Sequence, residues 1–514
     1  MSFNLKNKIT QRDKIAFLSA IIAFFVIHLF KISNYLPNHD ALTSFYSAQN
    51  IIGSGRWFLS VACLPSTYFD LPWVIGVLCA IYIALTSVIV VRIFDFESAF
   101  SVLITSALLV SFPAVTETML FGFTADGYFL AQLLAAVSVK LVTTVNQKWY
   151  MYIGAGILLC LCCGIYQAYF SFAAVLVLVY ILLEIIKKNK TTKEILAFGG
   201  KQIALFGAAL VVYYVVWKIM IALQGAAIND YQDISEAQNV AFSIRSVISS
   251  GIKMVRSLIS FVFGSNVLKG KITFYSIVGA VLLALIAFII CRVVIKKKLW
   301  QKKSLLLIFV VALIMIPLCA YFWQFASVNT AYGTRMLSSL ALLYLVPLAL
   351  SEKYLAKIWK KLIVGTLCLL IGLFALQANI AYLFIHQCYE STYHTTSEIL
   401  QRVHITAETG EEKIVIVGNF VQDTEIRNHP LSTELGSLTG TLKSTLAYKH
   451  DNISAFTKNT FFNETDFASH SEIAEVEQNP AIADMPCWPA KESVKLLDGY
   501  IVVKLSEVQY TAEN

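Results

Sequence analysis

Apolar residues fill eleven stretches of this chain, and each is long enough to cross a lipid bilayer as a helix. They lie at about 14–33, 72–92, 98–115, 125–144, 149–165, 167–187, 199–222, 272–295, 303–323, 335–351 and 359–385. A helix that spans the hydrocarbon core needs about 20 mostly apolar residues. We therefore predict a polytopic α-helical membrane protein with about eleven transmembrane helices. Little polar sequence separates the two stretches within 149–187, so the count depends on dividing this region in two.

The last part of the chain has a different pattern. Residues 387–514 are polar, with acidic patches and short β-branched runs at KIVIVG (413–418) and GYIVVKL (499–505). Short β-branched runs that are bounded by glycine or charge are typical of strands. We therefore predict a transmembrane domain at 1–386 and a small C-terminal α/β domain at 387–514.

Two of the polar connections are unusually long. Residues 34–71 follow the first apolar stretch, and residues 224–271 separate the seventh from the eighth. Within the second connection, Arg245, Lys253 and Arg256 recur among apolar residues at helical spacing. An amphipathic helix of this kind can lie flat in a membrane interface, so we expect this loop to rest on the outer membrane surface.

Lysine and arginine residues indicate how the helices are oriented. The loops at 140–148, 187–193, 292–303 and 352–361 are rich in lysine, whereas the alternate loops carry few cations for their length. Cytoplasmic loops carry an excess of these residues. With a cytoplasmic N-terminus and an odd number of helices, the tail lies on the extracytoplasmic side. The basic N-terminal segment is followed by no small-residue cleavage site, which predicts an uncleaved first helix.

Composition supports a membrane protein and argues against nucleic-acid binding. Hydrophobic residues make up 57% of the 514 residues and charged residues only 14%, and the mean hydropathy is +0.68. Soluble domains average roughly 45–50% apolar and about 25% charged residues. The net charge of +8 lies mostly in short loops between apolar stretches, so it reflects orientation in a membrane.

Ten cysteines are present, and most lie in apolar stretches, where cysteine acts as a small hydrophobic residue. Neither a CxxC pair nor a Cys/His cluster has the spacing of a metal site, so no cofactor is predicted, and the metal requirement stays open. Cys388 and Cys487 both lie in the tail, where a disulfide between them would close a long loop. The alternative is two buried thiols.

A carboxylate follows the first apolar stretch closely. Asp40 lies about seven residues beyond it, next to His39. A carboxylate at the outer surface of the membrane could act as a general base toward an acceptor hydroxyl. The alternative is a solvated loop aspartate that caps a following helix. Residues 41–52 have a loosely amphipathic pattern, which predicts an interfacial helix that leads to Arg56.

Two more carboxylates flank an apolar outer turn at 112–129. Glu117 and Asp126 lie near the predicted membrane boundary, where ionised groups are costly unless they are solvated or paired. This cost makes both residues candidates for a functional site. The alternative for Asp126 is that it only caps a helix predicted to begin at about residue 127.

Polar and cationic residues recur at two other outer positions. Tyr166 and Gln167 lie in the turn between two apolar stretches, where simple anchoring in the interface is the alternative for tyrosine. Arg335 follows Tyr332 and enters a helix from the outer side without another cation nearby. Such a guanidinium either reaches lipid headgroups or binds an anion, and its planar fork suits a phosphate diester. Arg56 raises the same question.

Together these motifs resemble a known family. NHDAL (38–42), GRWF (55–58), FTADGYF (123–129), GIYQAYF (164–170) and the arginine of YGTRML (332–337) are similar to the GtrII-type O-antigen glucosyltransferases. The wider architecture resembles the GT-C class of membrane glycosyltransferases, and the resemblance extends to about residue 385. The expected fold class is therefore a GT-C-like helical membrane protein with a small extracytoplasmic α/β domain.

The resemblance implies an inverting enzyme of a bacterial inner membrane. It would move a sugar, glucose in the family, from a polyprenyl phosphate such as undecaprenyl phosphate to an O-antigen-like surface polysaccharide. Asp40 and Asp126 would be catalytic carboxylates, and Arg335 and Arg56 would bind the donor phosphate. The expected contacts with substrate come from His39, Glu117, Tyr166, Gln167 and Tyr332. GT-C enzymes often have two adjacent acids where this chain has His39–Asp40, which puts a metal site there in doubt.

Two other functions fit a polytopic protein with outer carboxylates. A transporter or flippase for lipid-linked glycans would carry ionisable groups at helix midplanes and interrupted helices in related halves. Few mid-helix charges and no internal repeat are present, which favours an enzyme. A polymerase of lipid-linked glycans is close to the first hypothesis. The expected partners are the lipid-linked donor, the polysaccharide and the bilayer, and no nucleic acid.

Overall fold

The protein is mostly helical. The computed structural model describes residues 9–44, 47–66, 68–144, 147–187, 190–227, 244–264, 274–326, 333–420, 429–435, 445–461 and 466–507. The longer helices are α1 (Gln11–Ser33), α4 (Pro72–Phe94), α5 (Ala99–Ser111), α7 (Gly122–Val142), α8 (Trp149–Ile165), α9 (Tyr169–Lys187), α10 (Thr192–Gln224), α12 (Ile244–Phe263), α13 (Phe274–Lys296), α14 (Lys303–Ala320), α16 (Leu340–Tyr354), α17 (Lys357–Thr406) and α20 (His450–Thr460). The shorter helices are α2 (His39–Leu42), α3 (Leu59–Ala62), α6 (Pro113–Leu120), α15 (Phe322–Ala326), α19 (Pro430–Glu434), α21 (His470–Val476) and α22 (Pro480–Ala483).

Contacts divide the chain into two compact units that do not follow a single cut in the sequence. The helical unit comprises Met1–Tyr35, Ser47–Asn379 and Leu435–Thr439. The C-terminal unit comprises Leu36–Tyr46, Ile380–Glu434 and Gly440–Asn514. The segment directly after α1 therefore belongs with the end of the chain. The predicted boundary at 387 falls inside α17, a single helix that contributes to both units.

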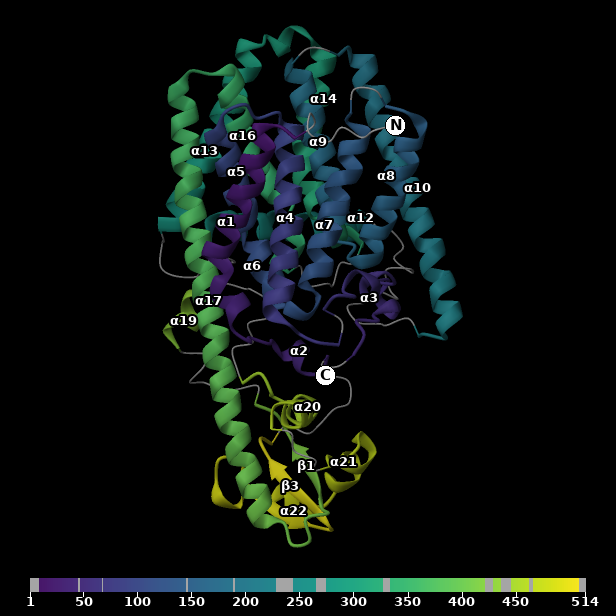
Figure 1. Cartoon of the computed structure of the whole chain (residues 1–514), viewed down its shortest axis with the longest axis vertical. Helices are drawn as coiled ribbons and strands as arrows, with labels where there is room; N and C mark the ends of the chain where they lie inside the picture. Colours follow the sequence, from purple (N-terminus) through teal and green to yellow (C-terminus); the bar gives the residue numbers. More distant parts are fainter. Residues whose placement is uncertain are drawn as a thin grey trace. The chain divides into compact units, whose positions relative to one another are not determined.

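The helical unit is a bundle in which α1 packs on α4 and α5, and α7 packs on α4 and α8 (Figure 1). Polar side chains join the helices inside it: Ser106 donates to the carbonyl of Ala16 at 3.0 Å, and His28 contacts the carbonyl of Val110 at 3.2 Å. Small residues and hydrogen bonds between helices are what hold helices together where lipid removes the hydrophobic driving force. The contacts between these helices are therefore of the kind that holds helices together in a membrane.

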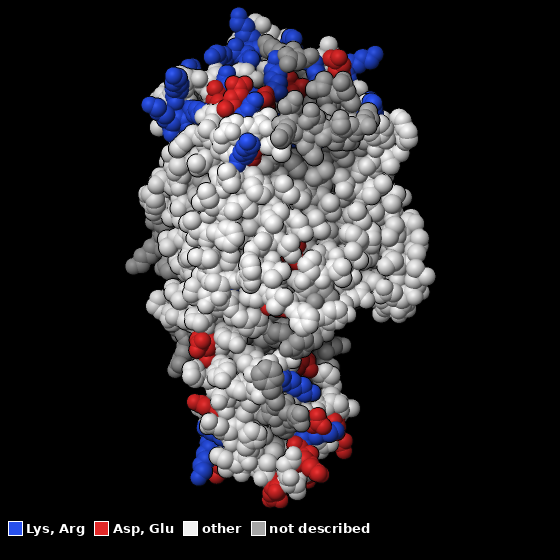
Figure 2. Space-filling view, viewed as in Figure 1, with Lys and Arg blue, Asp and Glu red and all other residues white. Residues whose placement is uncertain are grey.

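Charged side chains gather at one end of the helical unit. Arg92 at the end of α4 binds Asp13 in the first turn of α1 at 2.8 Å, and Asp95 pairs with Lys353 and, at 3.8 Å, with Lys187. Figure 2 shows lysines and arginines clustered there, above a broad band with few charged side chains on the visible face. Residues from the loops predicted to be cytoplasmic lie at or beside this end, which is expected if these loops are on the same side of a membrane.

The same contacts show which helices run from end to end of the helical unit. The helix α9 ends at this charged end, and α10 and α14 begin there, with Thr192 and Ser304 in contact at 3.1 Å. Lys296 at the end of α13 donates to the carbonyl of Tyr354 at 2.7 Å. The helix α10 therefore leaves the charged end, and α13 returns to it.

By length and composition, eleven helices among the described residues could span a membrane. This number includes α12 and leaves out the 17-residue α8, which the sequence interpretation counted in place of α12. The packed side of α12 carries Ser250, which is buried, and Ser257, which donates to the Tyr321 hydroxyl at 3.2 Å. The apolar residues Ile248, Ile252 and Ile259 on its opposite side are exposed. The predicted amphipathic helix of this connection is thus present.

Several predicted element boundaries are wrong. The stretch at 98–115 and the turn that follows it form two helices, α5 and α6, which meet at Phe112 before Pro113. Proline is readily accommodated in the first turn of a helix but interrupts the one before it. The last apolar stretch continues as α17 for 50 residues in total, far beyond residue 385. Polar residues extend this helix because the C-terminal unit packs around it.

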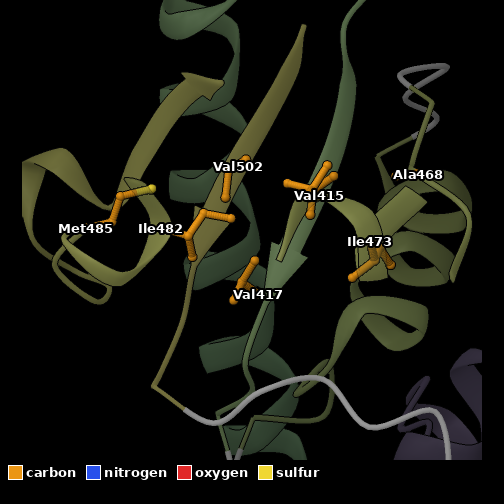
Figure 3. Packing of buried hydrophobic residues seen from close by; sticks show 8 residues of the cluster. Val415, Val417, Ala468, Ile473, Ile482, Met485 and Val502 are labelled. Atoms are coloured by element: carbon orange, nitrogen blue, oxygen red, sulfur yellow. The ribbon is translucent and has the colours of Figure 1, made fainter. Parts of the chain in front are cut away.

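The C-terminal unit contains a three-stranded sheet in the order β1–β3–β2, with β1 (Lys413–Val417), β2 (Val494–Leu497) and β3 (Tyr500–Lys504). β1 pairs with β3 in parallel, and β2 pairs with β3 in antiparallel orientation. Figure 3 shows Val415, Val417 and Val502 packed with Ile473 and Ile482 from the flanking helices. Both predicted strands are present. The strand β2 was missed, although Asp498 and Gly499 with positive φ form the turn that a two-residue hairpin requires.

Cys388 and Cys487 are both free thiols, so the disulfide considered from the sequence does not form. Cys388 is buried in α17, while Cys487 lies partly exposed near the end of the sheet. The Cys487 thiol donates to a Glu507 carboxylate oxygen at 3.3 Å instead. Arg402 of α17 donates to the carbonyls of Pro489 and Ala490, so hydrogen bonds connect the chain near Cys487 to α17 without a covalent link.

Candidate active site

Arg335 is held at the centre of a polar cluster in the helical unit. It lies in the 3-10 helix η4 (Thr334–Leu337), and its Nη1 is 3.6 Å from a carboxylate oxygen of Glu117 in α6. Its Nε donates to the Tyr166 hydroxyl at 3.3 Å, and the guanidinium carbon lies 4.2 Å from the centre of the Phe121 ring. The Glu117 side chain is fully buried. An ionised carboxylate without solvent needs a cation beside it, so the two residues stabilise each other.

Arg56 joins the same cluster from the other side of Tyr166. Its Nη1 donates to the Tyr128 hydroxyl at 3.0 Å, and its guanidinium carbon lies 4.9 Å from the centre of the Tyr166 ring. The rings of Tyr128 and Tyr166 are stacked, with centroids 4.3 Å apart. Two guanidinium groups are thus arranged around one pair of tyrosine rings. Guanidinium groups stack on aromatic faces while their N–H donors remain directed at anions.

Asp126 is buried and hydrogen-bonded, which excludes the helix-capping alternative. It is the fifth residue of α7 and does not precede the helix. The Ser66 hydroxyl donates to one of its carboxylate oxygens at 2.6 Å, and the backbone N–H of Gly127 donates to the other at 2.9 Å. The Cys63 thiol lies nearby, and burial, together with the Asp126 carboxylate, raises the pKa of this thiol well above its usual value. Asp126 therefore fixes the loop at 63–66 against α7.

Gln167 is a positioning residue for the loop that carries Arg56. Its side-chain amide donates to the carbonyl of Ser54 and to the Tyr213 hydroxyl, both at 2.9 Å. The Tyr213 hydroxyl in turn donates to the carbonyl of Gly55 at 3.1 Å. Trp217 of α10 donates to the carbonyl of Ile52 at 2.8 Å. This loop therefore lies beside the far part of α10, toward the end of the bundle opposite the lysines.

Gly164 lets the loop approach α8 closely. The backbone N–H of Phe58 donates to the Gly164 carbonyl at 2.8 Å, and a Cβ on Gly164 would lie 2.7 Å from the Trp57 ring. We expect Gly164→Ala to displace Trp57 and the adjacent Arg56, because an indole in a packed site cannot yield by that much. Overpacking of this kind costs about 1–3 kcal/mol.

The expected result for Gly164→Ala is a lower melting temperature and a lower transfer rate in the purified protein. Gly199→Ala is the matched control, since a Cβ on Gly199 meets no atom within 4 Å. Equal activity and melting temperature for Gly164→Ala and the unmodified protein would contradict the close approach.

Asp40 and His39 belong to the C-terminal unit, where they form the short helix α2. Asn38 caps this helix by accepting from the backbone N–H of Ala41 at 2.9 Å, so Asp40 is not the cap. The side-chain amide of Asn452 in α20 donates to the carbonyl of His39 at 3.0 Å. His39 Nε2 lies 3.2 Å from an Asp40 carboxylate oxygen, and 53% of the Asp40 side chain is exposed. A held and accessible carboxylate beside an imidazole is suited to accept a proton.

Two further predictions from the sequence concern this loop and Tyr332. The interfacial helix predicted at 41–52 is wrong: α2 ends at Leu42, and the next helical turn is the 3-10 helix η2 (Ile52–Ser54). The segment is not a regular helix. Its two ends are held by hydrogen bonds that Asn452, Gln167 and Trp217 donate to backbone carbonyls. Tyr332, the remaining predicted contact with substrate, lies outside the described residues.

Tertiary structure adds residues that the sequence interpretation did not select. Tyr128 stands two positions after Asp126 in a quoted motif, so its place in the motif was an available signal. Phe121 under Arg335 and Ser66 beside Asp126 had no local signal, since each contact joins elements far apart in sequence. Asn452 lies in the tail, 413 positions from its partner His39.

The cluster in the helical unit can bind an anion, and the α2 segment can accept a proton. Within the described part of the chain, no group of three or more His, Cys, Asp and Glu side chains has an arrangement that could hold a metal ion. Arg56 and Arg335 supply two guanidinium groups to this cluster. These are typical partners for phosphate.

Comparison with known proteins gives one family. The sequence model described as "Glucosyl transferase GtrII" matches residues 29–333, which is more than half of the chain. The matched range includes Asp40, Arg56, Glu117, Asp126 and Tyr166, and it ends just before Arg335. No curated protein and no solved structure gives a match. The match confirms the family resemblance that the motifs indicated.

Proposed function

Because the chain belongs to the GtrII glucosyl transferase family and is therefore a glycosyltransferase, we propose that it transfers a sugar from a polyprenyl phosphate to a surface polysaccharide. The donor sugar that the family suggests is glucose, and the acceptor is an O-antigen-like polysaccharide. The observation that carries this proposal is the pair of guanidinium groups around Tyr166 in a bundle of membrane-spanning length. A lipid-linked phosphate needs cations at the edge of the bilayer.

The donor phosphate is assigned to Arg335 and Arg56. A guanidinium has five N–H donors in a planar fork, so it can hold Glu117 or tyrosine and also bind phosphate oxygens. Glu117 and the tyrosine rings set the orientation of the guanidinium groups before substrate arrives. Preorganised cations of this kind stabilise the charge that develops on a departing phosphate.

The acceptor hydroxyl is activated by Asp40. Its oxygen attacks the anomeric carbon on the side opposite the phosphate, and the bond from that carbon to the phosphate oxygen breaks. The bonding electrons leave with the polyprenyl phosphate, and the hydroxyl proton passes to the Asp40 carboxylate. This displacement inverts the anomeric configuration. His39 contacts the Asp40 carboxylate and holds it for this role.

The direct test uses the full chain, purified in lipid nanodiscs, with radiolabelled sugars on a defined polyprenyl phosphate. Donors that carry glucose, galactose, mannose and N-acetylglucosamine are compared, with lipid-free surface polysaccharide as acceptor. Transfer from the glucosyl donor, with inversion shown by NMR of the product, is expected. Failure of every donor to transfer its sugar would contradict the proposed reaction.

We propose an extracytoplasmic location for the active site and the C-terminal unit. The lysine-rich loops that meet at one end of the helical unit support it. The expected membrane is a bacterial inner membrane, and the N-terminus is cytoplasmic.

A fusion experiment tests this orientation. Alkaline phosphatase fused after residue 514 is expected to be active, because that enzyme folds only outside the cytoplasm. Green fluorescent protein at the same position is expected to be dark. Fusions of both reporters after Lys297, in a lysine-rich loop, serve as controls with the opposite outcome. A bright C-terminal fluorescent fusion would contradict the proposed orientation of the tail.

A further inference from the structure

The C-terminal unit contains a cavity of about 410 Å³ between α2 and α20. Leu42 and Thr43, at the end of α2, form one wall. Asp451, Ala455 and Lys458, on α20, form another, and the chain at Phe467 and Ala468 completes it. All of these residues belong to the same compact unit. Small-molecule sites have volumes of roughly 300–1,000 Å³, so this cavity is large enough for a ligand.

Its lining mixes hydrogen-bonding groups with apolar surface. Asp451 supplies a carboxylate, Lys458 an ammonium group and Asn459 an amide, while Ser454 adds a hydroxyl. One carboxylate and one ammonium group leave the lining nearly neutral, which does not favour a phosphate or a polyanion. Phe467 and Leu42 supply the apolar part. Sugars present hydroxyl groups at their edges and C–H groups on their faces, so they match both kinds of surface.

The walls of the cavity are tied together. His450 Nε2 contacts the carbonyl of Ala468 at 3.0 Å, and Asn452 donates to the carbonyl of His39 at 3.0 Å. His470 Nε2 is 3.5 Å from a carboxylate oxygen of Asp451. The His450 side chain is 4% exposed, and its Nδ1 has no hydrogen-bond partner. The residues that shape the cavity are thus held in place, while the Nδ1 atom of His450 in its lining can still form a hydrogen bond.

The cavity adjoins the helix that carries Asp40. Asp40 is two residues before Leu42 and three before Thr43, and the Thr43 hydroxyl donates to the Asp40 carbonyl at 3.2 Å. Asn452 connects this helix to α20, whose side chains Asp451 and Lys458 line the cavity. A group bound in the cavity therefore lies against the end of the short helix that carries Asp40.

We propose that this cavity is the binding subsite for a sugar residue of the acceptor polysaccharide. It would hold a neutral saccharide through Asp451, Lys458 and Asn459, with a sugar face against Phe467. This assignment rests on the proposed transfer to a polysaccharide, and it adds the part of the chain that selects the acceptor. The C-terminal unit then both binds the acceptor and carries the base that activates it.

The test fills the cavity and measures acceptor binding and transfer separately. Ala455→Trp places a bulky indole on the cavity wall. Ala474→Trp is the matched control, because Ala474 is exposed on α21 and does not line the cavity. The full chain in nanodiscs is titrated, without donor, with lipid-free surface polysaccharide from the organism that carries the gene. Binding is measured by saturation-transfer-difference NMR.

Ala455→Trp is expected to weaken polysaccharide binding at least tenfold and to raise the acceptor KM by a similar factor, with the donor KM unchanged. Asp451→Asn and Lys458→Gln, which change no backbone contact, are expected to weaken binding less. The Ala474→Trp protein should match the unmodified one. Polysaccharide binding that is equal in the Ala455→Trp and Ala474→Trp proteins overturns the subsite.

Binding without donor separates this inference from the proposed reaction. If no donor supports transfer but Ala455→Trp abolishes saccharide binding, the reaction is wrong and the subsite stands. If transfer occurs and Ala455→Trp leaves the acceptor KM unchanged, the reaction stands and the subsite is wrong. Loss of binding in both tryptophan variants, with melting temperatures equal to that of the unmodified protein, also overturns it.

Discussion

Asp40→Asn is expected to reduce sugar transfer by about 10²–10⁴-fold, the usual contribution of a positioned general base. Asparagine keeps the size and hydrogen-bonding capacity of the side chain but cannot accept the proton. The carboxylate is exposed and its helix is capped by Asn38, so the substitution should leave α2 in place. The measurement is the initial rate of transfer from the glucosyl polyprenyl phosphate in nanodiscs at saturating donor and acceptor.

A control variant and a binding measurement are needed to interpret this result. Asp484→Asn removes another exposed carboxylate of the C-terminal unit, away from α2, and should retain the full rate. Polysaccharide binding by Asp40→Asn should be close to that of the unmodified protein, because Asp40 acts on the proton and not on affinity. A transfer rate for Asp40→Asn within threefold of the unmodified protein would remove Asp40 from the mechanism.

Arg335→Lys is expected to lower the transfer rate by at least about tenfold while the positive charge is retained. Lysine has no planar fork, so it cannot contact Glu117, the Tyr166 hydroxyl and a phosphate with fixed geometry. It also loses the stacking on Phe121, where the guanidinium carbon lies 4.2 Å from the ring centre. Steady-state kinetics with the glucosyl donor check this result, and the loss should fall on kcat, since the phosphate gains charge as it leaves.

The control for Arg335→Lys is Arg292→Lys, which changes an exposed arginine near the charged end of α13. Glu117→Gln is informative as well: it leaves the guanidinium in place but removes the carboxylate that orients it, so it should impair transfer less than Arg335→Lys. Full activity of Arg335→Lys would mean that Arg335 only anchors its helix.

The membrane-spanning elements were open to prediction because their cause is local. Each helix satisfies its own backbone hydrogen bonds, and its apolar length must match the bilayer, so a short window of sequence contains the whole signal. The strands β1 and β3 could also be predicted from a local signal. A parallel pair of strands that is buried on both faces appears in the sequence as a continuous β-branched run. The motifs around Asp40, Arg56, Asp126, Tyr166 and Arg335 indicated the family by their order and their shared predicted location on the outer face.

Some signals present in the sequence were read incompletely. The Asp498–Gly499 turn predicts a hairpin, and with it the strand β2. Pro113 predicts a break between two helices, where a single stretch was expected. Each depends on a residue or two with a strict backbone preference, and both are visible without a structure.

The arrangement of the candidate site was decided by tertiary structure. A polar side chain such as Gln167 has several equally good partners in sequence terms, and packing alone selects Ser54 and Tyr213. The contact between Asn452 and His39 assigns the predicted base to the C-terminal unit across 413 positions. Sequence therefore determined the spans, their charge asymmetry and the family. The partners of each buried polar group depend on distances between elements that no local pattern encodes.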